Sequence, residues 1–321
     1  MKALVAALSL VPGLVLAQQP DFSKTQIKDT AVAGNVHMLM GEGGNIAVSV
    51  GPEGVLLVDD QFAPLAQKIH AAIGKLNKGK IQYVLNTHWH FDHTGGNPIF
   101  GKEGRIVAHD NVRTRLSTEQ KIFGNTVAPL PKEGLPVITY DNSMSIFFNG
   151  EEIRLTHYPA GHTDGDTTVY FTQSNVLHTG DLLVVDSFPF IDMENGGTVE
   201  GYIQDQEKIL QTLPAGAKII PGHGVLATRE DMERAHTMMK ETTALIRSKR
   251  DAGKTLDQIK AEGLPEKYKS WGNAFIKEPQ YIEMIYKGLA ATAKTPTTSA
   301  TPATPATPAT PATPATPSKA R

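Results

Sequence analysis

The chain has 321 residues, of which 40% are hydrophobic and 20% are charged, and its formal net charge is −2. These proportions are ordinary for a globular protein with one large domain or two small ones, and there is no basic excess to indicate binding to nucleic acid or to an anionic membrane surface. There is no cysteine, which excludes disulfides and thiolate nucleophiles. A metal ion would therefore be bound by histidine, aspartate and glutamate side chains.

The first 17 residues are typical of a secretory signal peptide. Met1 and Lys2 provide a positively charged start, residues 3–16 form a short apolar run, and a small-residue cleavage signal ends at Ala17. The run is shorter than the roughly 20 residues of a membrane-spanning helix, which favours cleavage over an uncleaved anchor. We therefore expect a secreted or periplasmic protein with no stable membrane insertion after cleavage.

Short β-rich segments follow the signal. Strands are predicted at residues 36–40, 46–50 and 55–59, and the glycine-rich turns between them indicate an antiparallel meander. Apolar residues at helical spacing predict a surface helix over residues 61–78, and an apolar run predicts a buried strand over residues 81–85.

The rest of the chain repeats this order of strands and then helices. After a strand at 105–108, a helix at 111–120 and a proline-rich loop at 130–136, further strands are predicted at 137–140, 145–148, 153–158, 168–172, 176–179 and 218–220. Helices are predicted at 198–213, 228–250, 256–262 and 279–289, whereas residues 188–197 are predicted to be irregular. Thr228 caps the longest helix, with Asp231 three residues later. Two facing sheets with helices outside, a four-layer αββα sandwich of the α/β class, are the expected architecture.

A dense cluster of potential metal ligands follows the predicted strand 81–85. In the sequence V-L-N-T-H-W-H-F-D-H-T-G-G-N, which starts at Val84, the ligand types are His88, His90, Asp92 and His93. Imidazole and carboxylate groups suit zinc and neighbouring transition metals, and a loop at a strand end can aim them. The alternative is a polar loop that happens to be rich in histidine, but no packing requirement would place four such side chains so densely.

Three later stretches also place histidine or aspartate beside glycine at predicted strand ends. They are G-H-T-D-G-D, with His162, then H-T-G-D, with His178 and Asp181, and P-G-H-G, with His223. Each alone is a weak signal, since a single loop histidine is usually only solvated. Leaving His178 aside, these stretches and the first cluster provide five histidines and two aspartates at four strand ends, which is the number that two metal ions require.

The order H-x-H-x-D-H, G-H-T, G-D and P-G-H-G resembles the metallo-β-lactamase superfamily. The resemblance implies the αββα fold and two Zn²⁺ ions per chain, with iron or manganese as alternatives. It implies that the first metal is bound by His88, His90 and His162, that the second is bound by Asp92, His93 and His223, and that Asp181 bridges both. Asp59 matches the position that supports the site from behind the ligands.

At three positions that concern the substrate, this chain differs from many β-lactamases of the superfamily. Many β-lactamases of the superfamily have cysteine where this chain has Asp181, arginine where it has His93, and a carboxylate-binding lysine where it has Val184. Asp181 together with His93 is instead similar to hydroxyacylglutathione hydrolases and lactonases. The metal site is thus the firmer expectation, and the substrate the weaker one.

The function implied by the resemblance is hydrolysis of a cyclic amide or ester of a small molecule, β-lactam-like, by a metal-bound hydroxide, with Asp92 as a metal ligand and the catalytic group that orients the nucleophile. A lactonase or thioesterase is the alternative, although export argues against a glutathione thioester. More remote are a mononuclear iron dioxygenase and a binding protein with a vestigial site. No basic domain of the kind found in nuclease members is visible, and no nucleic-acid partner is expected.

The expected domain organisation is a signal peptide at 1–17, a catalytic domain at 18–293 with a C-terminal helical extension, and a disordered tail at 294–321. The tail carries a Thr-Pro-Ala repeat, which favours an extended polyproline-like chain. Further hypotheses concern a supporting role for His178, a flap formed by the turn 41–44, and pocket walls formed by Trp89, Phe91, Phe188 and Phe190.

Overall fold

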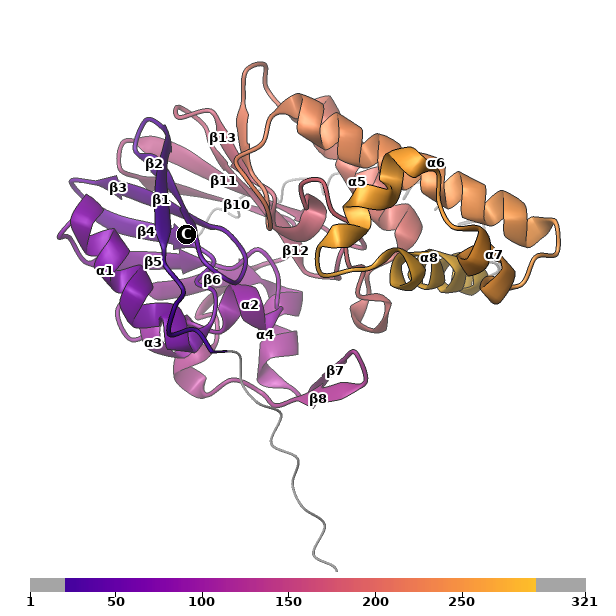
Figure 1. Ribbon diagram of the computed structural model, residues 1–321. Coiled ribbons are helices and arrows are strands. Elements are labelled where there is room, and N and C mark those ends of the chain that lie inside the picture. Colours follow the sequence, from indigo (N-terminus) through magenta and orange to yellow (C-terminus); the bar gives the residue numbers. More distant parts are fainter. Residues whose placement is uncertain (1–20, 293–321) are drawn as a thin grey trace, which may run out of the picture.

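The computed structural model describes residues 21–292 (Figure 1). The predicted signal peptide, residues 1–17, and the predicted tail, residues 294–321, lie outside the described residues. None of the helices within residues 21–292 is long and apolar enough to cross a membrane.

A seven-stranded sheet forms the first half of the fold. In order across the sheet, its strands are β1 (Lys28–Ala33), β2 (Val36–Met40), β3 (Ile46–Gly51), β4 (Gly54–Val58), β5 (Ile81–Leu85), β6 (Arg105–His109) and β9 (Ile138–Tyr140). Strands β2 to β4 are antiparallel, as the predicted meander requires, and β1, which was not predicted, pairs antiparallel with β2. Strands β4, β5, β6 and β9 are parallel. The carboxyl ends of the parallel strands therefore meet at one edge of the sheet.

A five-stranded sheet forms the second half. Its strands are β10 (Ser143–Phe148), β11 (Glu151–Tyr158), β12 (Asp166–Phe171), β13 (Val176–His178) and β14 (Lys218–Ile220). Strands β10 to β13 are antiparallel and β13 pairs with β14 in parallel. The loops that follow β11, β13 and β14 consequently leave the sheet at the same edge.

Three apolar layers separate the sheets and helices, so the predicted four-layer sandwich is confirmed. On β4, Leu56 and Val58 pack between the two sheets, while Val55 and Leu57 pack toward helix α1 (Ala66–Leu76). This alternation is what a strand buried on both faces requires. The third layer lies between the second sheet and helices α5 (Val199–Thr212), α6 (Arg229–Asp251) and α8 (Glu278–Thr292) (Figure 1).

The remaining helices cover the ends of these layers. They are α3 (Asn97–Phe100), α4 (Asp110–Ser117) and α7 (Leu256–Glu262), with 3₁₀ turns η1 (Ala63–Leu65), η2 (Lys132–Gly134), η4 (Met193–Asn195) and η5 (Glu266–Asn273). The capping box of Thr228 and Asp231 at the start of α6 is present as predicted. Turn η5 was not predicted, and η4 lies in the segment predicted to be irregular.

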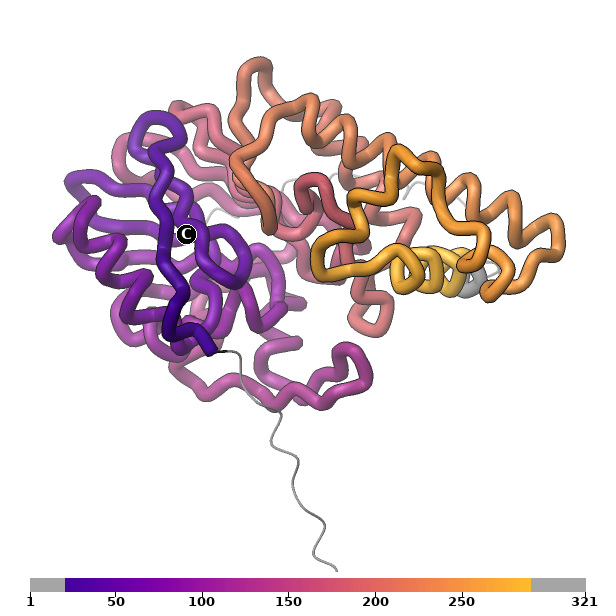
Figure 2. The backbone as a smooth tube through the Cα atoms, in the orientation of Figure 1, coloured from indigo at the N-terminus to yellow at the C-terminus, as the bar shows by residue number. Residues whose placement is uncertain are grey.

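Two local predictions were wrong. The helix predicted over 111–120 ends at Ser117, and residues 120–127 form a hairpin of β7 (Gln120–Ile122) and β8 (Asn125–Val127). Each of these strands has a single apolar residue, Ile122 or Val127, so neither an apolar run nor an alternating pattern marks it. The histidine cluster is also not entirely a loop, because residues Phe91–Thr94 form the single-turn helix α2. Figure 2 shows the β7–β8 hairpin protruding from the sandwich toward the side that carries the C-terminal helices.

Candidate metal centre

The polar side chains singled out in the sequence gather where strand ends of the two sheets meet. His88 and His90 follow β5, Asp92 and His93 lie on α2, His162 lies between β11 and β12, Asp181 lies on the 3₁₀ turn η3 (Gly180–Leu182) after β13, and His223 follows β14. The structure brings all seven together in two groups. One contains His88, His90, His162 and Asp181, the other Asp92, His93 and His223, and in each group the ligand atoms lie within 4.8 Å of one another.

Asp181 lies between the two groups, which is the place that the resemblance implied. Its Oδ1 lies 3.1 Å from His93 Nε2 and 3.5 Å from His223 Nε2. Its Oδ2 lies 3.5 Å from His162 Nε2. One carboxylate thus faces imidazole nitrogens of both groups, as a bridging ligand would.

The donor set fits two zinc-type ions. The Nε2 nitrogen of His88 is buried and has no hydrogen-bond partner, which is costly unless a metal ion takes that place. His93 Nε2 and His223 Nε2 lie 3.3 Å apart. Two nitrogens that ligate one tetrahedral zinc at about 2.0 Å each would lie roughly that far apart.

Burial and mutual charge set the protonation of these ligands. Burial is the largest influence on His162 and lowers its pKa to about 4, although the Asp181 carboxylate opposes it. Burial also acts to lower the pKa of His223, but Asp181 and Asp92 outweigh it and raise that pKa to about 10. Burial acts to raise the pKa of Asp92, but His93 and His223 hold it at about 2. The Asp92 carboxylate is therefore ionised at neutral pH, as a metal ligand must be.

Asp59 supports the site from below His93. Its Oδ2 accepts hydrogen bonds from His93 Nδ1 at 2.8 Å and from the Thr87 hydroxyl at 2.7 Å, and its Oδ1 accepts one from the Thr87 backbone N–H at 2.8 Å. Asp59 is fully buried and has a left-handed φ of 64°. The bond to Nδ1 fixes the ring and its tautomer, so that Nε2 of His93 remains free for a metal ion.

Asp192 supports His90 in the same way and was not identified from the sequence. Its Oδ2 lies 2.9 Å from His90 Nε2, which leaves Nδ1 of His90 facing His162 Nε2 at 2.8 Å. Asp192 is 1% exposed and also accepts hydrogen bonds from Asn195. A single aspartate in an irregular segment carries no sequence pattern that would have found it.

Replacing Asp192 by alanine is expected to lower zinc affinity by roughly 10- to 100-fold, because His90 loses the partner that orients its ring. Competition with a chromogenic chelator measures this affinity. The control is Glu194→Ala, which removes an exposed carboxylate two residues away and should leave affinity unchanged. Equal affinity in the two variants would show that Asp192 does not position His90.

The turn between β2 and β3 is fixed against the site, so the hypothesis of a free flap is not supported. The Gly44 N–H donates to the Asp92 carbonyl at 3.0 Å, and the side chain of Asn45 donates to the carbonyls of Pro221 and Gly224, both at 2.9 Å. A Cβ atom at Gly44 would lie 2.1 Å from Cε1 of His93. Glycine is needed here because the backbone runs against the imidazole.

The remaining hypotheses concern His178 and the aromatic residues predicted to form pocket walls. His178 is buried, and its ring contacts the Asn45 carbonyl and the Gly180 N–H, so it joins the two halves beside the ligands. Trp89 and Phe188 are buried in hydrophobic clusters, and Phe91 is 48% exposed. Phe190 lies close to the ligands, with its ring centre 5.9 Å from that of His90 and 6.0 Å from that of His162.

Comparisons with curated proteins connect this site to known hydrolases. The hydroxyacylglutathione hydrolase of Rhodospirillum rubrum is 28% identical over 201 residues, which cover 63% of this chain and 68% of that protein. The hydroxyacylglutathione hydrolase of Nitrosococcus oceani is 30% identical over 192 residues, which cover 56% of this chain and 65% of that protein. The alignments thus span about two thirds of each relative.

Solved structures share the fold at low sequence identity. A metallo-beta-lactamase from Pontibacter korlensis superposes with a TM-score of 0.56 at 16% identity, over 67% of this chain and 99% of that chain. A variant of the sec-alkyl sulfatase PisA1 superposes with a TM-score of 0.63 at 15% identity, over 81% of this chain and 50% of that chain. At such identities the likeness concerns the fold alone.

The family profile of the Metallo-beta-lactamase superfamily matches residues 41–223, which is more than half of the chain and includes all seven candidate ligands. The predicted enzyme class, a metal-dependent hydrolase, is confirmed at this level of description. The chain belongs to the metallo-beta-lactamase superfamily.

Proposed function

We propose that this protein is an exported, dinuclear zinc-dependent hydrolase that opens a cyclic amide or ester. The observation that supports it most is the convergence of seven ligand side chains in two groups around Asp181. Zinc ions bound there would lower the pKa of a water molecule to about 7 and polarise the scissile carbonyl. We also propose that residues 1–17 are removed and that the mature chain is periplasmic or secreted.

The exposed fractions of the candidate ligands indicate different roles for them. His88 and His162 are each 1% exposed, so they serve to hold a metal. The side chains of Asp92 and His223 are 24% and 32% exposed, so water and substrate reach the site on their side. Asp92 Oδ2 lies 3.3 Å from His223 Nε2, and this carboxylate is placed to accept a proton and to orient a nucleophilic water molecule.

A lactone or another ester is the second candidate, and Val184 is the reason. This residue stands where many β-lactamases of the superfamily carry a carboxylate-binding lysine, and its backbone forms a β-bridge with His223. An apolar side chain at this position does not supply the cation that binds the carboxylate of a β-lactam antibiotic in those enzymes. A thioester is a third candidate, supported by the two hydroxyacylglutathione hydrolases but not by the proposed export.

Metal removal is the direct test. The mature protein loaded with zinc is expected to contain two zinc ions per chain by elemental analysis and to hydrolyse a chromogenic β-lactam, with turnover lost on chelation and restored by zinc. Turnover that survives complete removal of metal would contradict the proposal. Two bound zinc ions without β-lactam turnover would favour lactones, whereas one bound iron would favour the dioxygenase alternative.

A further inference from the structure

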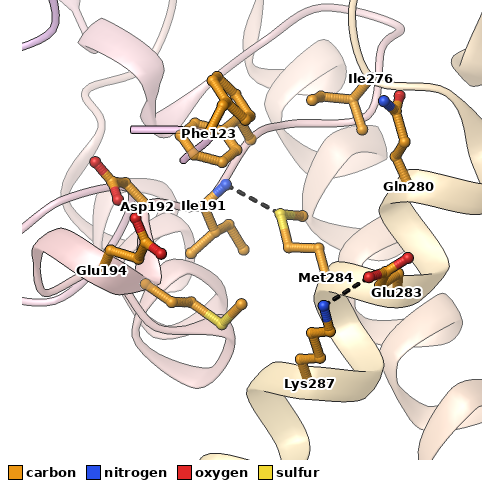
Figure 3. A pocket seen from close by; sticks show the side chains of 11 residues that line it. Phe123, Ile191, Asp192, Glu194, Ile276, Gln280, Glu283, Met284 and Lys287 are labelled. Atoms are coloured by element: carbon orange, nitrogen blue, oxygen red, sulfur yellow. Dashed lines mark hydrogen bonds and ion pairs between the residues drawn. The ribbon is translucent and has the colours of Figure 1, made fainter. Parts of the chain in front are cut away.

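An apolar cavity of about 340 Å³ lies beside the metal ligands. It is enclosed by three parts of the chain that are far apart in sequence, namely Phe123 at the tip of the β7–β8 hairpin, residues 190–194, and helix α8 with the preceding Ile276. Figure 3 shows Met284 reaching from α8 to Ile191, Lys287 paired with Glu283 on the same helix, and Asp192 and Glu194 on the opposite wall. Its volume lies in the range of small-molecule sites.

The same segment forms a wall of the cavity and orients two metal ligands. Asp192 lines the cavity and pairs with His90, as described above. The carbonyl of Phe190 lies 2.7 Å from Nδ1 of His162, while the ring of Phe190 faces the cavity wall formed by Phe123 at 4.4 Å between ring centres. The cavity therefore borders the site on the side of His90 and His162, where a substituent that extends from the substrate past the Phe190 ring could enter it.

Buried contacts hold the walls of the cavity in place. The Ile191 backbone N–H donates to Sδ of Met284 at 3.2 Å, which joins the ligand-bearing segment to α8. Ile191, Ile276 and Met284 are all less than 10% exposed, whereas Phe123 is 53% exposed. The hairpin thus presents a large apolar side chain to solvent at the mouth of the cavity, where a substrate group could cover it.

The charges around the cavity disfavour an anionic ligand. Among the described residues that line it, Asp192, Glu194 and Glu283 are acidic, and Lys287 is the only basic one. Lys287 Nζ is already paired with Glu283 Oε1 at 2.6 Å. A glutathione moiety, which carries two carboxylates and one ammonium group, would find no free cation here.

We infer that this cavity binds an uncharged apolar group, aliphatic or aromatic, of the substrate, and that it selects such substrates over glutathione conjugates. Binding of such a group can be tested without turnover. Only the kinetic test of this inference rests on the proposed hydrolase function. Phe123 is the specificity-determining residue that can be tested without disturbing the core, because its side chain is largely exposed.

Binding of the neutral fluorophore N-phenyl-1-naphthylamine to the zinc-loaded mature protein tests the cavity without turnover. Phe123→Ala is expected to weaken binding roughly three- to tenfold, since an aromatic contact is lost, and Phe123→Leu to restore part of it. The matched control is Phe147→Ala, which removes another exposed phenylalanine, 76% exposed on β10, and should bind as the unmodified protein does. Equal binding by Phe123→Ala and Phe147→Ala would overturn the inference.

Kinetics with γ-lactones that carry a methyl or a hexyl side chain provide the second readout. The hexyl lactone is expected to have a kcat/KM at least roughly tenfold higher, and Phe123→Ala to reduce that ratio while Phe147→Ala leaves it unchanged. Absence of all turnover, with fluorophore binding still sensitive to Phe123, would contradict the proposed lactone hydrolysis and support the cavity. Tighter binding of S-hexylglutathione than of hexanamide, measured by displacement of the fluorophore, would overturn the selection against glutathione conjugates.

Discussion

Replacing Asp92 by alanine is expected to lower kcat/KM by roughly 10²- to 10⁴-fold, the range for loss of a positioned acid–base group. The structure gives two reasons. Asp92 is one of three side chains in the second ligand group, so its loss leaves His93 and His223 with Asp181 as the one carboxylate near both among the described ligand residues. It is also the carboxylate closest to the solvent-exposed side of the site, 3.3 Å from His223. Initial rates and zinc content should therefore fall together.

The fold should survive this change. The backbone carbonyl of Asp92, which accepts from the Gly44 N–H, is unaffected by the substitution, and the Asp92 side chain is partly exposed. Asp251→Ala is the matched control, because it removes an aspartate that is 63% exposed at the end of α6. A variant Asp92→Ala that keeps near-full turnover, with an unchanged melting temperature, would remove Asp92 from the mechanism.

The sheets could be predicted from the sequence because each strand carries its own pattern. Strand β14 and helix α7 have the predicted bounds, since both are delimited by local signals such as glycine, proline and a threonine cap. The β7–β8 hairpin has no such pattern, because each of its strands contains a single apolar residue, Ile122 or Val127. Its position is determined instead by tertiary contacts, such as that of Phe123 with Phe190.

The ligands could be predicted for a similar reason, and Asp59 was predicted from the family resemblance, but Asp192, which orients His90, could not be predicted. His88, His90, Asp92 and His93 lie within six positions, a density that indicates a metal site without any structure. Asp192 lies 102 residues from His90, the ring that it orients, and nothing in its neighbourhood marks it. The cavity beside it depends on how α8 packs against residues 190–194, which is a property of the assembled core.

The largest effect on stability is expected from substitution of Asp59, which is hydrogen-bonded to His93. Replacing Asp59 by asparagine is expected to destabilise the protein by about 3–5 kcal/mol, because one charged member of a buried, hydrogen-bonded pair is lost. The new amide group would also face the Nδ1 of His93 and the Thr87 hydroxyl, where the carboxylate oxygen now accepts two hydrogen bonds. Zinc affinity should fall by roughly 10- to 100-fold as the His93 ring loses its orientation.

The neighbouring aspartate provides a matched control, because the two carboxyl groups are equally buried but differ in their hydrogen bonds. Asp59 and Asp60 are both fully buried, but Asp60 accepts one backbone hydrogen bond, from Gly96, and its Oδ2 has no partner. Burial, together with the charge of Asp59, raises the pKa of Asp60 well above its usual value. The raised pKa favours the neutral form of Asp60. Asp60→Asn, which replaces that form by a neutral group of similar shape, should therefore change the free energy of unfolding far less than Asp59→Asn. Chemical denaturation of both variants measures the difference, and equal destabilisation would show that the charge of Asp59 does not hold His93 in place.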